Sequence, residues 1–378
     1  MAEHQQLKSI EVEGFASIRS ARVELGALNV LIGANGSGKS NFIKAFDLLG
    51  NVGDGLLNMF VGLNGGAAAL INDRADSQRI TLTLETPLQN YQVCLTANSN
   101  EEMFFDDEVI SYHGSGAQHP WTTSLGRGHR ESRLTLTSDD PPVAPAAAQI
   151  ATLLRGCRAY HFHDTSSDAP VKRPTPAADN LALHADAGNI AAVLLRLRDS
   201  DLREDKVAYR RIVGAVRLIA PFFGDFILRP DNTDRISLQW QDVSSDTVYP
   251  GNQMSDGTLR FTCLATLLLQ PELPSLVIID EPELGLHPVA VGQLADLLRV
   301  ASIRSQILIA TQSVTLLNQF SAEDVIVAGL RDGNSVFVRP NTAKLQNWLA
   351  EYSLGELWEK NIIGGHPGSL GSVLDPSP

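Results

Sequence analysis

The chain begins with a pattern of apolar and polar residues that predicts mainly strands. Apolar residues alternate with polar ones in four short segments of the first hundred residues: 10–12, 23–25, 80–84 and 91–95. This period of two is typical of strands with one buried face. The apolar run 28–32 predicts a fully buried strand, and residues 41–49 predict a helix. We therefore expect two antiparallel strand pairs, with one buried strand and its helix between them in sequence.

The middle of the chain is less regular. Residues 51–66 are rich in glycine and predict irregular structure, and residues 98–140 predict only exposed strands and loops. The elements expected after them are a proline-rich linker at 141–145, a short helix to about 154, a strand at 157–162, a mobile loop at 170–176 and two helices between 189 and 223.

The last part of the chain returns to strong periodicity. Residues 236–240 alternate as a strand, and from 276 onward strand-like runs alternate with helix-like stretches. The expected elements are strands at 276–279, 307–310 and 325–328 and a helix at 291–300. Because such alternation is typical of parallel sheets, we expect the parallel half of an α/β core here.

Composition narrows the class of protein. The 378 residues are 43% hydrophobic and 19% charged, which is ordinary for a globular chain. No apolar run approaches the ~18 residues that would span a bilayer, and the polar N-terminus lacks a signal-peptide pattern. The three cysteines (94, 157 and 263) have no metal-ligand spacing. We therefore expect a cytoplasmic protein with reduced thiols and no membrane partner.

The charge distribution bears on nucleic-acid binding. A net charge of −13 argues against a protein that binds nucleic acid through its whole surface. The best local candidate is Arg196–Arg217, with seven basic and four acidic side chains. Such a mixture on a helical segment is more often a solvated face than a DNA site, so direct DNA contact there is the secondary hypothesis.

The most specific motif lies between the strand predicted at 28–32 and the helix predicted at 41–49. Residues 33–40, Gly-Ala-Asn-Gly-Ser-Gly-Lys-Ser, fit the phosphate-loop pattern G-x-x-x-x-G-K-[ST] at every fixed position. Glycines let backbone N–H groups face an anion, Lys39 would reach the β- and γ-phosphates, and Ser40 would bind Mg²⁺. We therefore predict binding of a nucleoside triphosphate and Mg²⁺. The predicted nucleotide-binding residues are Gly33, Asn35, Gly36, Ser37, Gly38, Lys39, Ser40 and Asn41.

Two acidic residues end a later strand. The apolar run 276–279 is followed directly by Asp280 and Glu281. Because ligands of open α/β folds bind at the carboxyl ends of the strands, both carboxylates are expected at the site. We predict that Asp280 holds Mg²⁺ together with Ser40, and that Glu281 polarises the attacking water.

A further segment resembles a motif of ABC-type ATPases. Ser255-Asp256-Gly257 opens a predicted helix and lies 280 − 255 = 25 residues before Asp280. It resembles the signature motif, whose helix N-terminus binds a γ-phosphate held by another subunit. A plain N-cap role for Ser255 is also open, but the spacing to Asp280 favours the signature interpretation. Segment 282–288 resembles the loop that contacts the second subunit in that family.

Together these motifs resemble the ATPase heads of the SMC/RecF/OLD group, and specifically its small bacterial predicted ATPases of the AAA family. The opening segment 7–15, Asn41 directly after the phosphate loop, the loop 283–288 and the ending Leu354–Trp358 carry the resemblance. The resemblance implies an α/β P-loop NTPase with ABC-ATPase head architecture. Such a head has a mixed or parallel core sheet, an antiparallel β subdomain and a helical signature and lid subdomain.

Two positions depart from the group's pattern. Gln312 follows the strand at 307–310, where the group usually has a histidine that senses the γ-phosphate. Glutamine can hydrogen-bond a phosphate or water but carries no charge. No clear Q-loop glutamine is present; His163 and Asp164 stand at the best matching position, where a solvated loop is equally open. We therefore expect slow or partner-stimulated hydrolysis, with Glu281 and Gln312 as catalytic residues.

The resemblance implies a single ABC-type ATPase domain over residues 1–378. Its expected parts are an N-terminal lobe at 1–165, a helical lid insertion at 166–235, a C-terminal lobe at 236–345 and a tail at 346–378. No long heptad segment is present, so coiled-coil arms are not expected, and neither is a fused Toprim nuclease domain.

The resulting hypothesis is an ATPase that forms a homodimer or higher homo-oligomer around ATP and hydrolyses it to ADP and phosphate. The expected role is the switch or sensor of a DNA-processing or anti-phage system whose effector, for example a Toprim-like nuclease, is encoded separately. The alternatives are a RecF-like DNA-binding repair ATPase, a transporter ATPase subunit and a non-hydrolysing nucleotide-gated scaffold. Fold alone does not decide among them.

Overall fold

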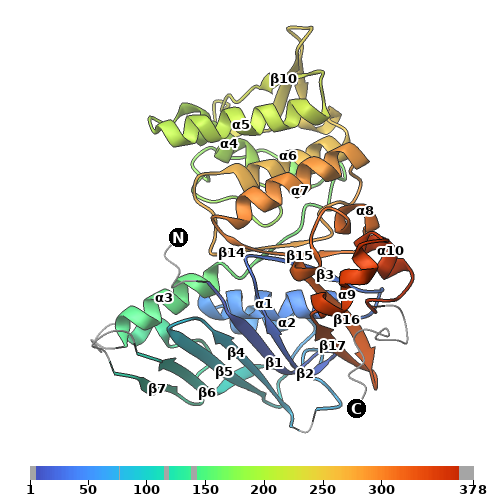
Figure 1. Ribbon diagram of the computed structural model, residues 1–378. Coiled ribbons are helices and arrows are strands. Elements are labelled where there is room, and N and C mark those ends of the chain that lie inside the picture. The colour runs from blue at the N-terminus through green and yellow to red at the C-terminus, as the bar shows by residue number, and fades with distance from the viewer. Residues whose placement is uncertain (1–5, 76, 115–118, 138–142, 366–378) are drawn as a thin grey trace. The chain divides into compact units, whose positions relative to one another are not determined.

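The computed structural model describes residues 6–75, 77–114, 119–137 and 143–365. Contacts divide the chain into two compact units. Figure 1 colours the chain by residue number. The first unit contains residues 1–159, 274–278 and 305–378, and the second contains residues 160–273 and 279–304. The chain therefore leaves the first unit and returns to it twice.

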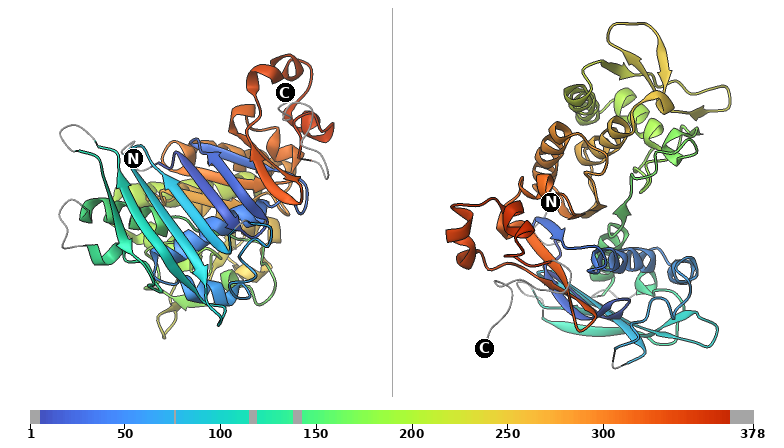
Figure 2. Two further views of the ribbon diagram at one scale, coloured as in Figure 1. Left: turned by 90° about the horizontal axis from the view of Figure 1, so that it is seen from below. Right: turned by 90° about the vertical axis from the view of Figure 1, so that its right-hand side faces the viewer.

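A six-stranded antiparallel sheet belongs to the first unit; Figure 2 shows its strands side by side in the left view. Its order is β2–β1–β4–β5–β6–β7. The strands are β1 (Ser9–Phe15), β2 (Ile18–Glu24), β4 (Arg79–Glu85), β5 (Gln89–Ala97), β6 (Met103–Tyr112) and β7 (Trp121–Gly126). Both predicted strand pairs are confirmed, β1 with β2 and β4 with β5. Alternate side chains are buried, as a half-covered sheet requires.

Three helices share one hydrophobic core with this sheet: α1 (Lys39–Gly53), α2 (Leu57–Leu63) and α3 (Ala144–Arg155). The predicted helices at 41–49 and up to about 154 are confirmed. The prediction of irregular structure at 51–66 is wrong, because Leu57, Phe60 and Val61 bury one side of α2 and so offset its glycine content. Of the predicted linker, residues 141 and 142 lie outside the described residues, whereas Pro145 lies in the first turn of α3, where proline is tolerated.

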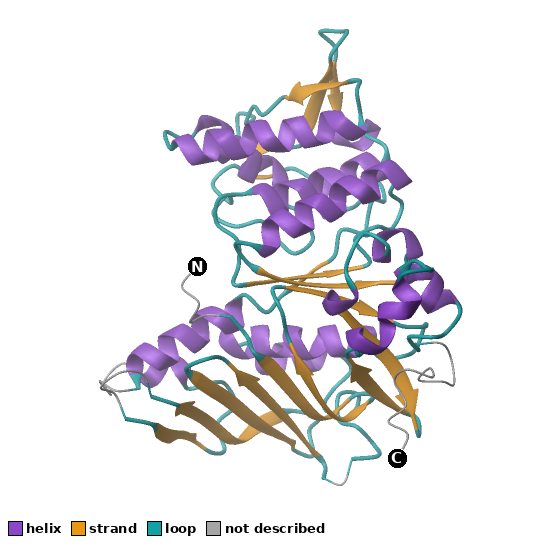
Figure 3. Cartoon of the chain, viewed as in Figure 1, coloured by secondary structure: helices purple, strands orange, loops and turns teal. Residues whose placement is uncertain are grey.

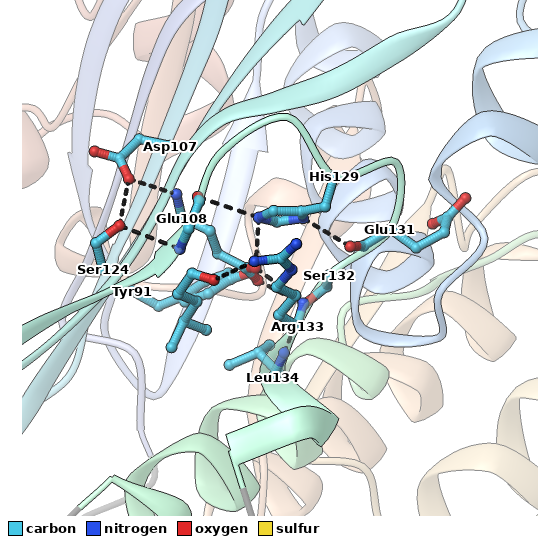
Figure 4. Close-up of polar contacts among 11 residues, drawn as sticks. Tyr91, Asp107, Glu108, Ser124, His129, Glu131, Ser132, Arg133 and Leu134 are labelled. Atoms are coloured by element: carbon cyan, nitrogen blue, oxygen red, sulfur yellow. Dashed lines mark hydrogen bonds and ion pairs between the residues drawn. The ribbon is translucent and has the colours of Figure 1, made fainter. Parts of the chain in front are cut away.

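A buried polar network joins β5 and β6 to the segment that follows β7 (Figure 4). The fully buried Glu108 carboxylate accepts hydrogen bonds from Tyr91 Oη (2.7 Å), Ser132 Oγ (2.5 Å) and Arg133 N (2.9 Å). Burial, then the nearby Glu108 charge, raises the pKa of Tyr91 well above its usual value. His129 Nε2 lies 3.6 Å from the same carboxylate. The segment 98–140 is therefore not merely exposed strands and loops, as its weak periodicity predicted.

The second six-stranded sheet has the order β17–β16–β3–β15–β14–β8. Its strands are β3 (Leu28–Ile32), β8 (Ala159–Tyr160), β14 (Leu276–Asp280), β15 (Gln306–Thr311), β16 (Val325–Arg331) and β17 (Asn334–Val338). The predicted parallel pairing is confirmed, because β3 runs parallel to both β15 and β16, whereas β17 is antiparallel to β16. The strand predicted at 157–162 is shorter, since only Ala159 and Tyr160 have strand pairing.

Helices dominate the second unit: α4 (Ile190–Asp199), α5 (Arg203–Ile219), α6 (Asp256–Leu269) and α7 (Pro288–Ser302) (Figure 3). All four were predicted. The single strand predicted at 236–240 is wrong, because the segment divides between two small sheets. There β11 (Arg235–Ile236) pairs with β9 (Thr175–Pro176), and β12 (Gln239–Asp242) lies between β10 (Phe223–Phe226) and β13 (Val248–Pro250). β9 also lies within the loop predicted at 170–176.

Three short helices complete the first unit: α8 (Val314–Leu317), α9 (Thr342–Leu349) and α10 (Leu354–Glu359). The three cysteines are free, and burial raises the pKa of the Cys157 and Cys263 thiols to about 12. Within the described ranges, no helix combines the length and apolarity that crossing a membrane requires.

Candidate functional site

Within the segment 33–40, residues 33–38 form the loop between β3 and α1 in the first unit, and residues 39 and 40 begin α1. α1 begins at Lys39, and Gly38 before it has a φ of 98°, a left-handed conformation that favours glycine. A Cβ atom on Gly38 would clash with Ser335 Oγ, and one on Gly33 with Ala328 O. Both glycines are therefore required for the loop to lie this close to β16 and the start of β17.

The polar groups of this loop fit a phosphate. Lys39 is buried, and its Nζ donates to Gly33 O (2.7 Å) and Ala34 O (3.0 Å). Ser37 Oγ is also buried and has no hydrogen-bond partner in the described part of the chain, whereas a Cβ on Gly36 would meet open space. A buried hydroxyl without a partner is unfavourable, and a phosphate oxygen would satisfy it. The loop thus offers a cation, an unsatisfied hydroxyl and room beside Gly36.

The two residues that follow Lys39 have different surroundings. Ser40 is exposed. Asn41 Nδ2 donates to Ser17 Oγ (2.8 Å), and Ser17 Oγ shares a 2.7 Å hydrogen bond with Ser335 Oγ. In this structure the Asn41 side chain therefore ties α1 to the β1–β2 turn and to β17.

Strand register places Gln312 beside the phosphate loop. β3 and β15 run parallel, and Ile32 is paired with Thr311. Gly33 and Gln312 are the next residues of the two strands, so both emerge at the same edge of the sheet. Of the predicted site residues, the first unit therefore brings together Gln312 and the whole segment 33–41.

The second unit holds the predicted acidic residues and His163. Asp280 ends β14, and Glu281 after it has a φ of 43°, which is unusual for a residue with a side chain. His163 Nε2–H donates to the Asp280 carbonyl oxygen (2.8 Å). Asp164 is exposed, and hydrogen bonds from Ser166 hold its pKa below the usual value. His163 rather than Asp164 is therefore the residue tied to the acidic segment.

Arg260 on α6 connects these segments, and our sequence analysis did not identify it. Its guanidinium donates to His163 O (2.8 Å), to Leu284 O (3.0 Å) and, at 3.4 Å, to Thr165 Oγ1. One side chain thus links α6 to the segments that carry His163 and Glu281. The available signal was composition, because Asp256 and Arg260 are the only charged residues of α6.

The predicted signature residues lie at the start of α6. Ser255 is the N-cap, and its Oγ accepts a hydrogen bond from Thr258 N (3.3 Å). The Asp256 side chain is 63% exposed, with Lys172 Nζ 4.0 Å away. A Cβ atom on Gly257 would lie 2.7 Å from Gly285 O, so a side chain there would push away the loop that follows Glu281.

The predicted metal ligands belong to different units, Ser40 to the first and Asp280 to the second. Across the described residues, no group of three or more His, Cys, Asp or Glu side chains could hold a metal ion. A hydroxyl and a carboxylate are suitable oxygen ligands for Mg²⁺, which usually completes its coordination with phosphate oxygens and water. Each of the two residues therefore has the donor chemistry of a Mg²⁺ ligand.

Comparisons with known proteins bear on the family and the fold of this chain. The family described as "AAA ATPase domain" matches residues 6–208, and the family described as "AAA domain, putative AbiEii toxin, Type IV TA system" matches residues 158–318. One similar solved structure is an SMC head bound to the C-winged helix domain of ScpA. It is 16% identical, with a TM-score of 0.58, and the match covers 90% of this chain and 99% of the other.

A second similar structure is an SMC head domain with an extended coiled coil, bound to the C-terminal domain of ScpA derived from Pyrococcus furiosus. It is 16% identical, with a TM-score of 0.54, and the match covers 92% of this chain and 99% of the other. These likenesses confirm the predicted α/β fold of the ABC-type ATPase head. The match over residues 6–208 spans more than half of the chain, and the protein therefore belongs to the AAA ATPase domain family.

Proposed function

We propose that this protein binds ATP with Mg²⁺, hydrolyses it to ADP and phosphate, and acts as one ABC-type ATPase domain that dimerises around the nucleotide. The observation that carries the proposal is the loop 33–40, with buried Lys39, an unsatisfied Ser37 hydroxyl and glycines at 33, 36 and 38. Helix α1 begins directly behind the loop, so its positive end adds to the attraction for phosphate.

In the proposed reaction each residue has one task. Lys39 Nζ has three N–H donors, so it would keep its bond to Gly33 O and bind the β- and γ-phosphates with the others. Glu281 orients and deprotonates the attacking water, and Gln312 hydrogen-bonds the γ-phosphate or that water. Ser40 and Asp280 would hold Mg²⁺, which neutralises charge that develops on the phosphate oxygens. His163 positions the Asp280–Glu281 segment through its hydrogen bond to the Asp280 carbonyl.

Nucleotide binding is tested by Lys39→Ala, which removes the cation of the phosphate loop. We expect no detectable ATP binding by calorimetry, with an unchanged circular dichroism spectrum. Lys44→Ala, on the same helix but outside the motif, is the matched control and should bind ATP like the parent protein. Unchanged ATP affinity in Lys39→Ala would remove the basis of the proposal.

Assembly follows from the signature segment. We propose that Ser255, Asp256 and Gly257 complete the nucleotide site of a second copy, since the amino end of α6 attracts the γ-phosphate that ADP lacks. Glu281→Gln protein with ATP should dimerise, or form dimer units in a larger ring, and adding Ser255→Arg should prevent this. Thr247→Arg, at another exposed position of the second unit, is the control. If light scattering finds the same mass with ATP, ADP and no nucleotide, Ser255 is only the helix cap.

For the biological role, we propose a cytoplasmic switch or sensor in a DNA-processing or anti-phage system, with a separately encoded effector such as a Toprim-like nuclease. The match of residues 158–318 to a family described by a putative AbiEii toxin supports a defence role. Purification of the native complex followed by mass spectrometry tests it, and a protein that never retains a second polypeptide would contradict it.

A RecF-like ATPase that binds DNA through Arg196–Arg217 is the second candidate. Several of these arginines have partners within the chain: Arg196 bonds Asn180 O, Arg198 pairs with Asp199, and Arg217 bonds Gly224 O. These contacts favour a structural role for part of the basic stretch. Salt-dependent, ATP-dependent binding to duplex DNA would support the RecF-like alternative instead.

A further inference from the structure

The last described residues of the chain, Ser353–Gly365, form a compact segment that we call the C-terminal clasp. It begins with α10, whose Ser353 and Glu356 form a reciprocal capping box. Gly355 N donates to Asn318 Oδ1 (2.6 Å), so α10 packs closely on α8, as Figure 1 shows. Because α8 begins two residues after Gln312, the clasp is anchored to the segment that carries this residue.

The other end of the clasp contacts the phosphate loop. Ile363 is fully buried, and the Gly365 carbonyl accepts a 2.7 Å hydrogen bond from Ala34 N. Gly365 has a φ of 89°, and a Cβ atom on it would lie 3.0 Å from Val327 Cγ1 and 3.2 Å from Trp358 Nε1. Both the conformation and the close packing therefore require glycine at this position.

The hydrogen bond between Ala34 and Gly365 is connected to Lys39 through a single peptide group. In a trans peptide the carbonyl and the N–H point in opposite directions. The N–H of the Gly33–Ala34 peptide binds Gly365 O, and the carbonyl of the same peptide accepts from Lys39 Nζ at 2.7 Å. Hydrogen bonds in such a chain polarise one another and fix the orientation of the peptide between them.

We propose that the C-terminal clasp is a positioning element of the nucleotide site. Through Gly365 it orients the Gly33–Ala34 peptide, and this peptide places the ammonium group of Lys39 for the phosphates. Through α10 and α8 it holds the segment of Gln312 on the same framework. The inference rests on the proposed function, because it assigns a structural support to the same phosphate loop.

The test is Gly365→Val in the full chain, with Gly55→Val as a matched control. Gly55 also has a positive φ, 70°, but a Cβ on it would meet no atom within 4 Å. Calorimetric titration with ATP separates two effects, since loss of folded protein lowers the number of sites whereas misplaced Lys39 raises the dissociation constant. We expect Gly365→Val to raise the ATP dissociation constant by roughly three- to tenfold, which corresponds to the loss of one hydrogen bond. Gly55→Val should leave the dissociation constant unchanged.

Equal dissociation constants for Gly365→Val and the parent protein, whatever the number of sites, would overturn the inference. If Gly365→Val does not fold, Gly365→Ala replaces it, with Gly55→Ala as the control and the same criteria. Failure of the proposed function is distinguishable: in that case the parent protein binds no ATP, or Lys39→Ala binds it equally well. A parent that needs Lys39 but tolerates Gly365→Val refutes the clasp alone.

Discussion

The two units of this protein hold their functional residues by different means. In the first unit, a backbone hydrogen bond from Ala34 N to Gly365 O supports the phosphate loop, and Lys39 Nζ donates to the carbonyls of Gly33 and Ala34. In the second unit, a side chain joins the segments that carry His163 and Glu281, because Arg260 donates hydrogen bonds to the carbonyls of His163 and Leu284.

This difference has consequences for substitution. A loop held by its own backbone tolerates most changes in neighbouring side chains and is sensitive mainly at its glycines. The segments joined by Arg260 depend on that residue, since losing it removes the donor to the carbonyls of His163 and Leu284. We therefore expect the phosphate loop of the first unit to control nucleotide binding, and Glu281 of the second unit, together with Gln312 of the first, to control hydrolysis of the bound nucleotide.

The largest separation of the two roles is expected for Glu281→Gln. The substitution keeps the shape of the side chain but removes the base, so the rate of phosphate release should fall by about two orders of magnitude or more. ATP affinity, measured by calorimetry, should remain. Glu272→Gln, an exposed acid of the same unit, is the control. Hydrolysis at the parent rate would make Glu281 a structural acid.

Arg260→Met should have the next largest effect. It removes the links between α6, His163 and Leu284 while keeping much of the apolar stem, so kcat should fall about tenfold or more through misplaced Glu281. The ATP dissociation constant should stay within about twofold, because the phosphate loop is held without Arg260. Arg299→Met, which removes a surface pair with Asp296, is the control. Weakened ATP binding with unchanged kcat would contradict the division of roles.

A change within the antiparallel sheet should affect stability without affecting chemistry. Glu108→Gln replaces an acceptor of three hydrogen bonds with an amide whose NH₂ group faces donors. The free energy of unfolding in urea should fall by about 1–3 kcal/mol, and kcat per folded molecule should not change. A loss of activity beyond the loss of folded protein would show that this sheet takes part in the reaction.

The smallest expected effect is a pH dependence at β4. A hydrogen bond from Lys8, assisted by Ser9 and Arg22, lowers the pKa of Glu85 from 4.5 to about 2. Because the folded pKa is depressed, the stabilisation is complete above pH 4.5 and is lost as pH falls towards 2. Partial exposure of the cluster reduces its size to about 1 kcal/mol. Urea unfolding at pH 5 and pH 3 should show a smaller decrease for Glu85→Gln than for the parent protein, and equal decreases would exclude this contribution.

The sequence alone determined the elements whose signal is local. The buried strand 28–32, the phosphate loop and the helix after it follow from apolar runs and glycine spacing within about 25 residues. The strand pairs β1–β2 and β4–β5 follow from alternation in the same way. α2 was not predicted because its few apolar residues give a weak local pattern, and only their burial in the folded protein shows that they stabilise a helix.

Only the tertiary structure decided which distant residues meet. Arg260 lies 97 residues from His163 in sequence, and nothing in the local pattern pairs a guanidinium with that particular carbonyl. The hydrogen bond between Ala34 N and Gly365 O joins distant parts of the chain through backbone atoms alone. Because every residue has these backbone atoms, residue identity gives no sign of such a contact except where only glycine allows the close approach. Residue identity and spacing predict the residues of the candidate site. The hydrogen bonds that position these residues depend instead on chain topology, which brings carbonyl and N–H groups together whatever their distance in sequence.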